Sequence, residues 1–240
     1  MRDFQLPGRS ATHAGEAMVA TSHPLATVAA LDVLKSGGAA MAAAVAATAV
    51  MCVTEPAMTG IGGDCFMLYA PKGGDKVTAF NGSGRAPRAA SVEALRAKGM
   101  TGELTPDSAH SVTVPGCVQA WERLVADHGR KELGELLKPA IKAAEDGFAV
   151  TPRVAYDWGR CAAKLARDTG ASAIFLPGGR APKAGERFKN PRLAETLKKI
   201  AQSGAKAFYT GDVAESMVKL LNSHGALHTM DDFAAAEGEY

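Results

Sequence analysis

The residues best suited to binding chemistry lie in one loop, residues 81–87, which reads Asn-Gly-Ser-Gly-Arg-Ala-Pro. It follows an expected strand, and functional groups are often carried on loops. Its one cation, Arg85, has a planar guanidinium that can hold a carboxylate through two parallel hydrogen bonds. With Asn81 and Ser83 it forms our candidate substrate-binding set. An arginine in a Gly/Ser turn can equally be a surface charge, so the loop alone leaves both interpretations open.

Other reactive residue types lack a supporting pattern. His224 and His228 stand four apart, but Gly225 lies between them and no acidic ligand is near, so we expect no metal site. Cys117 stands at an expected helix start, where the helix dipole would stabilise a thiolate. Without an evident histidine partner, it is expected to be a core residue. The sequence has no P-loop, His-Glu-x-x-His or Cys-x-x-Cys motif, so we predict no cofactor and assign no catalytic residue.

Composition narrows the class of protein. The 240 residues are 47% hydrophobic and 22% charged, which suits a soluble globular chain of one large or two small domains. The net charge is +2 and the basic residues are scattered, so we expect no nucleic-acid partner. No apolar run is long enough to cross a membrane, and no secretory signal is visible. Four widely spaced cysteines favour reduced thiols in the cytoplasm.

The elements that must position the loop are predicted from the sequence. Strands are concentrated in the first half of the chain and helices dominate the second half, an α/β layered pattern. Apolar spacing predicts a helix over Pro24–Lys35. An all-apolar stretch, Ala39–Val53, predicts a buried helix. Strands are expected within Gly15–Ser22, over Cys65–Tyr69 and Lys76–Phe80 as a hairpin, and over Ser111–Val114. Further helices are expected from Pro115 to His128, over Leu133–Asp146, Arg153–Arg167, Pro191–Gly204 and Asp212–Ser223, and from Thr229.

A glycine-dense turn, with Gly60, Gly62 and Gly63, joins the buried helix to the strand at Cys65. Each glycine costs conformational entropy on folding, so three within four residues suggest a positive φ or a close backbone approach. A phosphate-binding turn would open into a helix, and the strand that follows argues against this weaker alternative.

Several motifs, in order from about Met18 to about Phe233, resemble the gamma-glutamyltransferases (gamma-glutamyl transpeptidases). They are Met18–Thr27, Leu34–Gly38, Glu55-Pro56 with Thr59–Gly63, Val114–Gly116, Pro139-Ala140 with Ala144–Phe148, and Phe208–Gly211. The resemblance covers the front part of that family's large subunit. Several motifs in the right order are far more specific than any one of them.

The resemblance implies an N-terminal-nucleophile hydrolase, an αββα sandwich that cuts itself into a large and a small subunit. The new N-terminal threonine of the small subunit attacks a gamma-glutamyl amide, with its own amine as base. We find no such threonine segment and expect the natural polypeptide to continue past Tyr240. Thr21-Ser22-His23 superficially resembles the start of the family's small subunit. Because Pro24 and a helix follow it, Thr21 is not assigned as the nucleophile.

Two departures from the family pattern bear on specificity. The family's substrate-carboxylate arginine stands in Arg-Glu-x-Ala-Pro; aligned on Ala86-Pro87, Ser83 takes its place and Arg85 falls two residues later. Either Arg85 reaches the same carboxylate from a new position, or the acyl group lacks the alpha-carboxylate, as in the related cephalosporin (glutaryl) acylases. The second departure, Ala39-Ala40, removes the polar residues that could cap the start of the helix.

We therefore expect residues 1–240 to be a single domain, part of an incomplete αββα sandwich, with residues 1–14 poorly ordered. The predicted activity of the complete protein is cleavage of gamma-glutamyl amides such as glutathione through a threonine acyl-enzyme. The alternatives are a glutaryl-acylase-like amidase and a non-catalytic module that binds small carboxylates. The expected partners are a small-molecule substrate and a small subunit from the same precursor, and this chain by itself is expected to be inactive.

Overall fold

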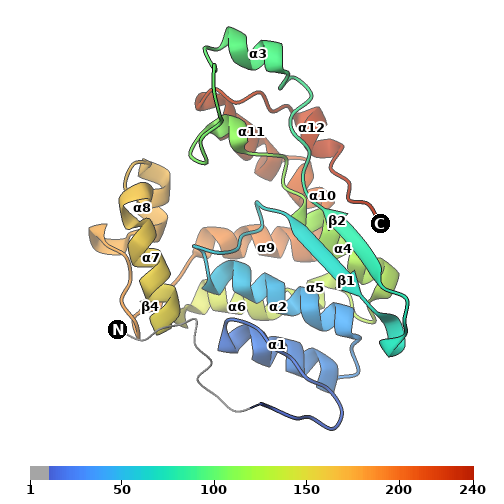
Figure 1. The fold of residues 1–240 in the computed structure, drawn as a ribbon. Coiled ribbons are helices and arrows are strands. Elements are labelled where there is room, and N and C mark those ends of the chain that lie inside the picture. The colour runs from blue at the N-terminus through green and yellow to red at the C-terminus, as the bar shows by residue number, and fades with distance from the viewer. Residues whose placement is uncertain (1–10) are drawn as a thin grey trace. The chain divides into compact units, whose positions relative to one another are not determined.

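The computed structural model describes residues 11–240, and Figure 1 labels their helices and strands. The chain divides into two compact units. The first contains the chain up to Gly60 and Leu136–Glu195, and the second contains Ile61–Glu135 and Thr196–Tyr240. The expectation of a single domain stays a prediction. Residues 1–10 of the segment expected to be poorly ordered lie outside the described residues.

The first unit is built on a helical hairpin. Helix α1 (Pro24–Lys35) packs on α2 (Ala40–Thr54), which also packs on α6 (Lys138–Asp146). The chain turns between α1 and α2 at Gly37, whose φ of 82° places it in the left-handed region where glycine is favoured. Most of α2 is buried because its alanines let the neighbouring backbones come close. Ala39 offers no side-chain hydrogen bond at the helix start, which confirms the lost cap.

An aromatic cluster completes the first unit. Strands β3 (Phe148–Ala149) and β4 (Arg187–Phe188) pair antiparallel, and α7 (Pro152–Leu165), α8 (Thr169–Phe175) and η3 (Pro177–Gly179) lie between them in the chain. The rings of Phe148, Trp158, Phe175 and Phe188 contact one another. The Trp158 indole donates a 2.8 Å hydrogen bond to the carbonyl of Phe175, so this buried polar group is satisfied.

The second unit contains the hairpin of β1 (Cys65–Tyr69) and β2 (Thr78–Gly82), with η1 (Pro71–Gly73) between the strands. The strands are antiparallel, with Cys65 opposite Gly82. Helix α4 (Cys117–His128) packs against both strands (Figure 1). The buried face of α4 carries Trp121 and Leu124, so the hairpin has one covered face.

Three of the remaining helices of the second unit pack together: α10 (Lys206–Tyr209), α11 (Asp212–Ser223) and α12 (Met230–Ala234). The others are α3 (Val92–Ala97) and η2 (Ala109–Ser111). The chain passes between the two units within α5 (Leu133–Leu136) and again within α9 (Pro191–Ser203). No helix within residues 11–240 is both long and apolar enough to cross a membrane.

The structure corrects several expected elements. Gly15–Ser22 and Ser111–Val114 are not strands. The Val114 N–H donates a hydrogen bond to the carbonyl of Arg85, but residues 111–114 join no strand ladder within the described chain. The second hairpin strand lies two residues later than expected and takes Asn81 and Gly82 out of the loop. The helix expected over Leu133–Asp146 is broken at Leu137, and α3, α8, β3 and β4 were not expected.

The glycine-dense turn does not work as expected. A Cβ on Gly60 or Gly62 would meet no atom within 4 Å, and neither φ lies in the positive region. The turn acts instead through the carbonyl of Gly63, which accepts hydrogen bonds from the N–H groups of Gly116 and Cys117. It therefore anchors the start of α4, and the close backbone approaches occur elsewhere.

Candidate functional site

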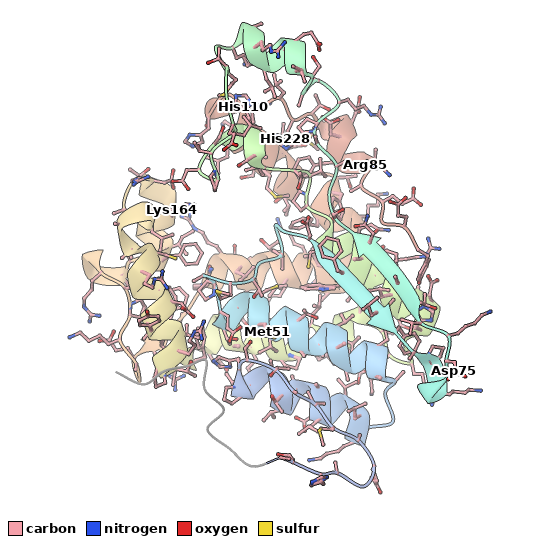
Figure 2. All side chains as sticks on the ribbon, in the orientation of Figure 1. Met51, Asp75, Arg85, His110, Lys164 and His228 are labelled. Carbon is pink, nitrogen blue, oxygen red and sulfur yellow. The ribbon has the colours of Figure 1, made fainter. Side chains whose placement is uncertain are left out.

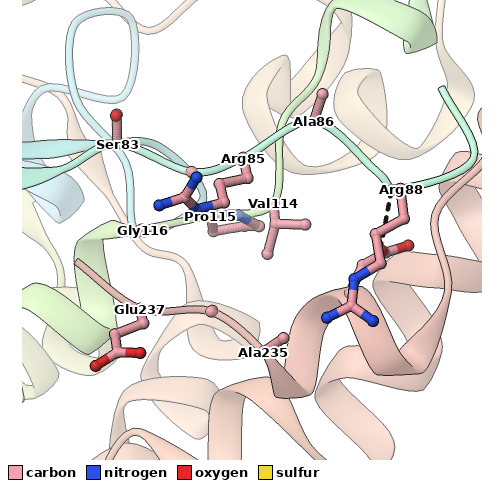
Figure 3. Close-up of a pocket in the computed structure, with 12 residues that line it drawn as sticks. Ser83, Arg85, Ala86, Arg88, Val114, Pro115, Gly116, Ala235 and Glu237 are labelled. Carbon is pink, nitrogen blue, oxygen red and sulfur yellow. Dashed lines mark hydrogen bonds between the residues drawn. The ribbon is translucent and has the colours of Figure 1, made fainter. Parts of the chain in front are cut away.

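A pocket of about 200 Å³ lies where the chain leaves β2. Ser83 and Arg85 from the sequence-predicted set line it, together with Arg88 on the same loop. The wall that faces this loop is the segment after α12, with Ala235 and Glu237 (Figure 3). A pocket of this size suits a small acyl group.

Two glycines let the loop lie directly on the segment of residues 114–116. A Cβ on Gly84 would overlap the carbonyl of Val114, and a Cβ on Gly116 would overlap the carbonyl of Gly82. The Val114 N–H donates a 3.0 Å hydrogen bond to the carbonyl of Arg85. The backbone of Arg85 is therefore fixed by close contacts between two segments, and these contacts require glycine at position 84 in the loop and at position 116 in the facing segment.

Polar side chains fix the start of the loop. The Asn81 side-chain oxygen accepts hydrogen bonds from the Ser83 N–H at 3.1 Å and the Ser83 hydroxyl at 2.7 Å. The Asp64 carboxylate accepts one from the Gly84 N–H at 3.1 Å. Asn81 lies at the end of β2 and does not line the pocket. It supports Ser83, and any contact of its own with a ligand stays a prediction.

The guanidinium of Arg85 is open to a ligand. The side chain is 80% exposed, and its nearest carboxylate is that of Glu239 at 3.9 Å, itself 66% exposed. An exposed pair at that distance contributes little to stability, because water screens both charges. A carboxylate that entered the pocket could therefore displace Glu239 at small cost.

The second arginine of the loop is anchored through its backbone. The Arg88 N–H donates a 3.1 Å hydrogen bond to one carboxylate oxygen of Asp232 on α12 (dashed in Figure 3). The other oxygen accepts hydrogen bonds from the N–H and hydroxyl of Thr229, which completes a capping box. Burial raises the pKa of Asp232, but these hydrogen bonds outweigh it and hold the pKa below its usual range.

A buried tyrosine, Tyr209, fixes the segment below the loop, residues 115–119. The Tyr209 hydroxyl donates to the carbonyl of Pro115 at 2.8 Å and accepts from the N–H of Gln119 at 3.1 Å. Burial raises the pKa of this phenol well above its usual range, so it stays protonated. Tyr209 belongs to a family-like motif seen in the sequence, and the structure gives that motif a positioning role.

The other sequence candidates lie away from the pocket lining. Cys117 is buried, which confirms the core assignment. His228 is buried against Phe233, with His110 near enough to influence it; Figure 2 labels both histidines. Residues 11–240 hold no group of three residues placed to bind a metal. The Thr21 hydroxyl pairs with that of Thr27 at the start of α1, a structural contact.

Sequence reasoning missed three residues of this site: Arg88, Asp232 and Tyr209. Arg88 stands three residues after Arg85 and could have been found as a second cation on the loop. The Thr-x-x-Asp spacing of Thr229 and Asp232 is a capping signal. The contact of Asp232 with a loop 144 residues away leaves no trace in a single sequence.

Comparison with known proteins places the chain among related sequences and structures. A family model described as gamma-glutamyltranspeptidase matches residues 26–239. The chain is similar to a glutathione hydrolase-like YwrD proenzyme of Bacillus subtilis, with 38% identity over 93% of this chain and 42% of the relative.

Two solved structures share the fold. The gamma-glutamyltranspeptidase of Helicobacter pylori superposes with a TM-score of 0.86 at 30% identity, over 96% of this chain and 66% of that one. The cephalosporin acylase of Bacillus halodurans gives a TM-score of 0.86 at 38% identity, over 97% and 46%. The αββα class predicted from the sequence is thus confirmed, with only part of it present in the described chain.

Proposed function

We propose that this chain, which belongs to the gamma-glutamyltranspeptidase family, is part of an amidohydrolase that cleaves amides of small carboxylate-bearing acyl groups. The observation that carries the proposal is the small pocket with two arginines on one loop, Arg85 and Arg88. The chain spans less than half the length of the curated relatives that it matches. The nucleophile is therefore proposed to come from the remainder of the protein, as a threonine freed by self-cleavage.

Gamma-glutamyl amides such as glutathione are the first substrate class that we propose. The guanidinium of Arg85 would bind the carboxylate of the acyl group, and the loop backbone would hold that arginine in place. The small subunit is the proposed partner. The four cysteines, all within the described residues, form no disulfide, which supports the proposal of a cytoplasmic protein.

Glutaryl amides are the second proposed class. Ser83 stands where the family's arginine is expected, so the cation of this pocket comes from a different backbone position. A shift of two residues can favour an acyl group with one distal carboxylate over one with an alpha-amino acid end. The similarity to a cephalosporin acylase supports this alternative.

A direct assay separates the two classes. The protein as its gene encodes it is given gamma-glutamyl and glutaryl p-nitroanilides, with the uncharged butyryl anilide as reference. The proposal expects faster turnover of one carboxylated anilide than of the butyryl anilide, and no turnover by the 240-residue chain alone. Equal turnover of all three would refute carboxylate recognition, and turnover by the 240-residue chain would refute the assigned nucleophile.

The role of Arg85 is tested by Arg85→Ala in the same protein. Loss of a charge-assisted hydrogen bond is expected to lower kcat/KM for the preferred carboxylated anilide. The expected decrease corresponds to a loss of about 1–3 kcal/mol of transition-state stabilisation. The matched control is Arg96→Ala, on exposed α3 away from the pocket lining. An unchanged kcat/KM would show that Arg85 is a surface charge.

A further inference from the structure

Asp232 is a buried carboxylate that connects two walls of the pocket. Only 7% of the residue is exposed, whereas the neighbouring Asp231 is exposed on the same turn of α12. The carboxylate of Asp232 accepts hydrogen bonds from three donors, two in Thr229 and one in Arg88. A carboxylate taken out of water is costly unless it is hydrogen-bonded, so these three bonds hold it in one orientation.

The partner of Asp232 on the loop is the arginine that sequence reasoning missed. The backbone of Arg88 is tied to α12, while its side chain is exposed and lines the pocket. Figure 3 shows Arg88 and Arg85 on the loop that forms one wall. The charge of Arg88 also lowers the pKa of Asp232, so the two groups interact electrostatically as well as through the backbone.

We infer that Asp232 is a positioning residue for substrate specificity: it fixes Arg88 so that the pocket presents a second guanidinium to an anionic acyl group. This inference rests on the proposed function. The carbonyl of Arg85 accepts a hydrogen bond from the Val114 N–H, and the Asp64 carboxylate holds the preceding residue, Gly84. The N–H of Arg88 is held from the α12 side by Asp232. The two arginines thus have separate anchors, and we expect loss of one anchor to leave the other arginine in place.

Asparagine is the sharpest substitution at this position because it has the shape of aspartate but one acceptor oxygen fewer. In Asp232→Asn, the side chain cannot accept from both Arg88 and Thr229 and has no charge beside Arg88. We expect KM for the preferred carboxylated anilide to rise about tenfold, because a hydrogen bond to a charged group is lost, with kcat changed less than about twofold. KM for the butyryl anilide should not change.

A double-mutant cycle tests whether Asp232 acts through Arg88. Arg88→Gln removes the guanidinium and keeps the backbone N–H, so it should reproduce the rise in KM. If Asp232 acts through Arg88, the double variant Arg88→Gln/Asp232→Asn has the KM of Arg88→Gln alone. Asp231→Asn is the matched control and should behave as wild type.

The outcomes separate the inference from the proposed function. If the wild-type protein does not prefer a carboxylated anilide, the proposed function fails and the inference fails with it. If wild type shows the preference, three results would overturn the inference alone. The first is an unchanged KM in Asp232→Asn, and the second is an equal rise in KM for the butyryl anilide. The third is that the effects of the two substitutions on KM add in the double variant. Should Asp232→Asn not fold, Arg88→Gln decides, and an unchanged KM for the carboxylated anilide overturns it.

Discussion

The α1–α2 hairpin and the pocket loop both bring backbone segments unusually close, but by different means. In the hairpin, alanines such as Ala46 fill the space between helices with small apolar side chains. In the loop, Gly84 and Gly116 leave no side chain at all, and carbonyl groups occupy that space. Close packing by alanine gives a dry core, whereas close packing by glycine leaves polar backbone and exposed arginines around a cavity. This difference separates a structural region of the family pattern from the candidate binding region.

The largest effect is expected where a substitution disrupts the glycine contacts of the pocket loop. Gly84→Ala would drive a Cβ into the carbonyl of Val114, and the loop must shift to relieve it. We expect a loss of about 3 kcal/mol in the free energy of unfolding, the upper end for overpacking. Chemical denaturation measures it, with Gly60→Ala as the control, since Gly60 has open space around it. Equal stability of the two variants would contradict the packing described for the loop.

The next largest effect is expected where a substitution disrupts the alanine packing of α2. Ala46 is fully buried in α2, so Ala46→Leu should cost about 2 kcal/mol of unfolding free energy through overpacking. Ala44→Leu, on the exposed face of the same helix, should change stability by less than about 0.5 kcal/mol. Thermal and urea unfolding of the pair provide the measurement. A tolerated leucine at position 46 would mean that the helices have room to separate.

A smaller effect sharpens the role of the segment below the loop. Tyr209→Phe removes the hydroxyl that links Pro115 to Gln119 and leaves a buried carbonyl and a buried N–H without that partner. The expected cost is about 1–2 kcal/mol of unfolding free energy. Tyr69→Phe is the control, because the structure gives its hydroxyl no hydrogen bond within residues 11–240. The prediction fails if both variants are as stable as wild type.

The smallest effect concerns pH, since each of the two units contains one buried histidine, His23 in the first and His228 in the second. Burial lowers the pKa of both His23 and His228 below the ordinary 6.5. The unfolded chain therefore binds more protons than the folded one just below that pH, and stability present above about 6.5 is lost as the pH falls. We expect the Tm to fall between pH 7 and pH 5.

His23→Asn separates the two histidines. Asparagine can still accept the hydrogen bond that His23 receives from the Leu25 N–H at the start of α1, and it does not titrate. The fall in Tm with pH should be shallower in this variant and unchanged in His13→Asn, where the histidine is exposed. The same pH slope in wild type and His23→Asn would assign the effect to the second unit.

Much of the fold was predictable where the chemistry is local. Helix α1 has the bounds read from its apolar spacing and Pro24, and β1 and α11 also match. Predictions failed where a partner decides the outcome. Residues 111–114 join no strand ladder in the described chain, and β2 continues to Gly82 because Gly82 pairs with Cys65, the first residue of β1. In the candidate site, the distinctive composition of the loop predicted Arg85 and Ser83, which line the pocket, but nothing in the sequence predicted Asp232 or the supporting Tyr209.

The sequence by itself determined the family, the buried character of α2 and the loop that carries Arg85, because motifs, periodicity and composition are properties of neighbouring residues. Only the tertiary structure decided which glycines matter. Gly60 and Gly62 attract attention in the sequence yet face open space, whereas Gly84 and Gly116 lie against carbonyls from distant segments. Likewise, Asp232 became part of the site through a hydrogen bond to Arg88, 144 positions away. Contacts between remote segments arise only when the chain folds, and they set the geometry of the pocket.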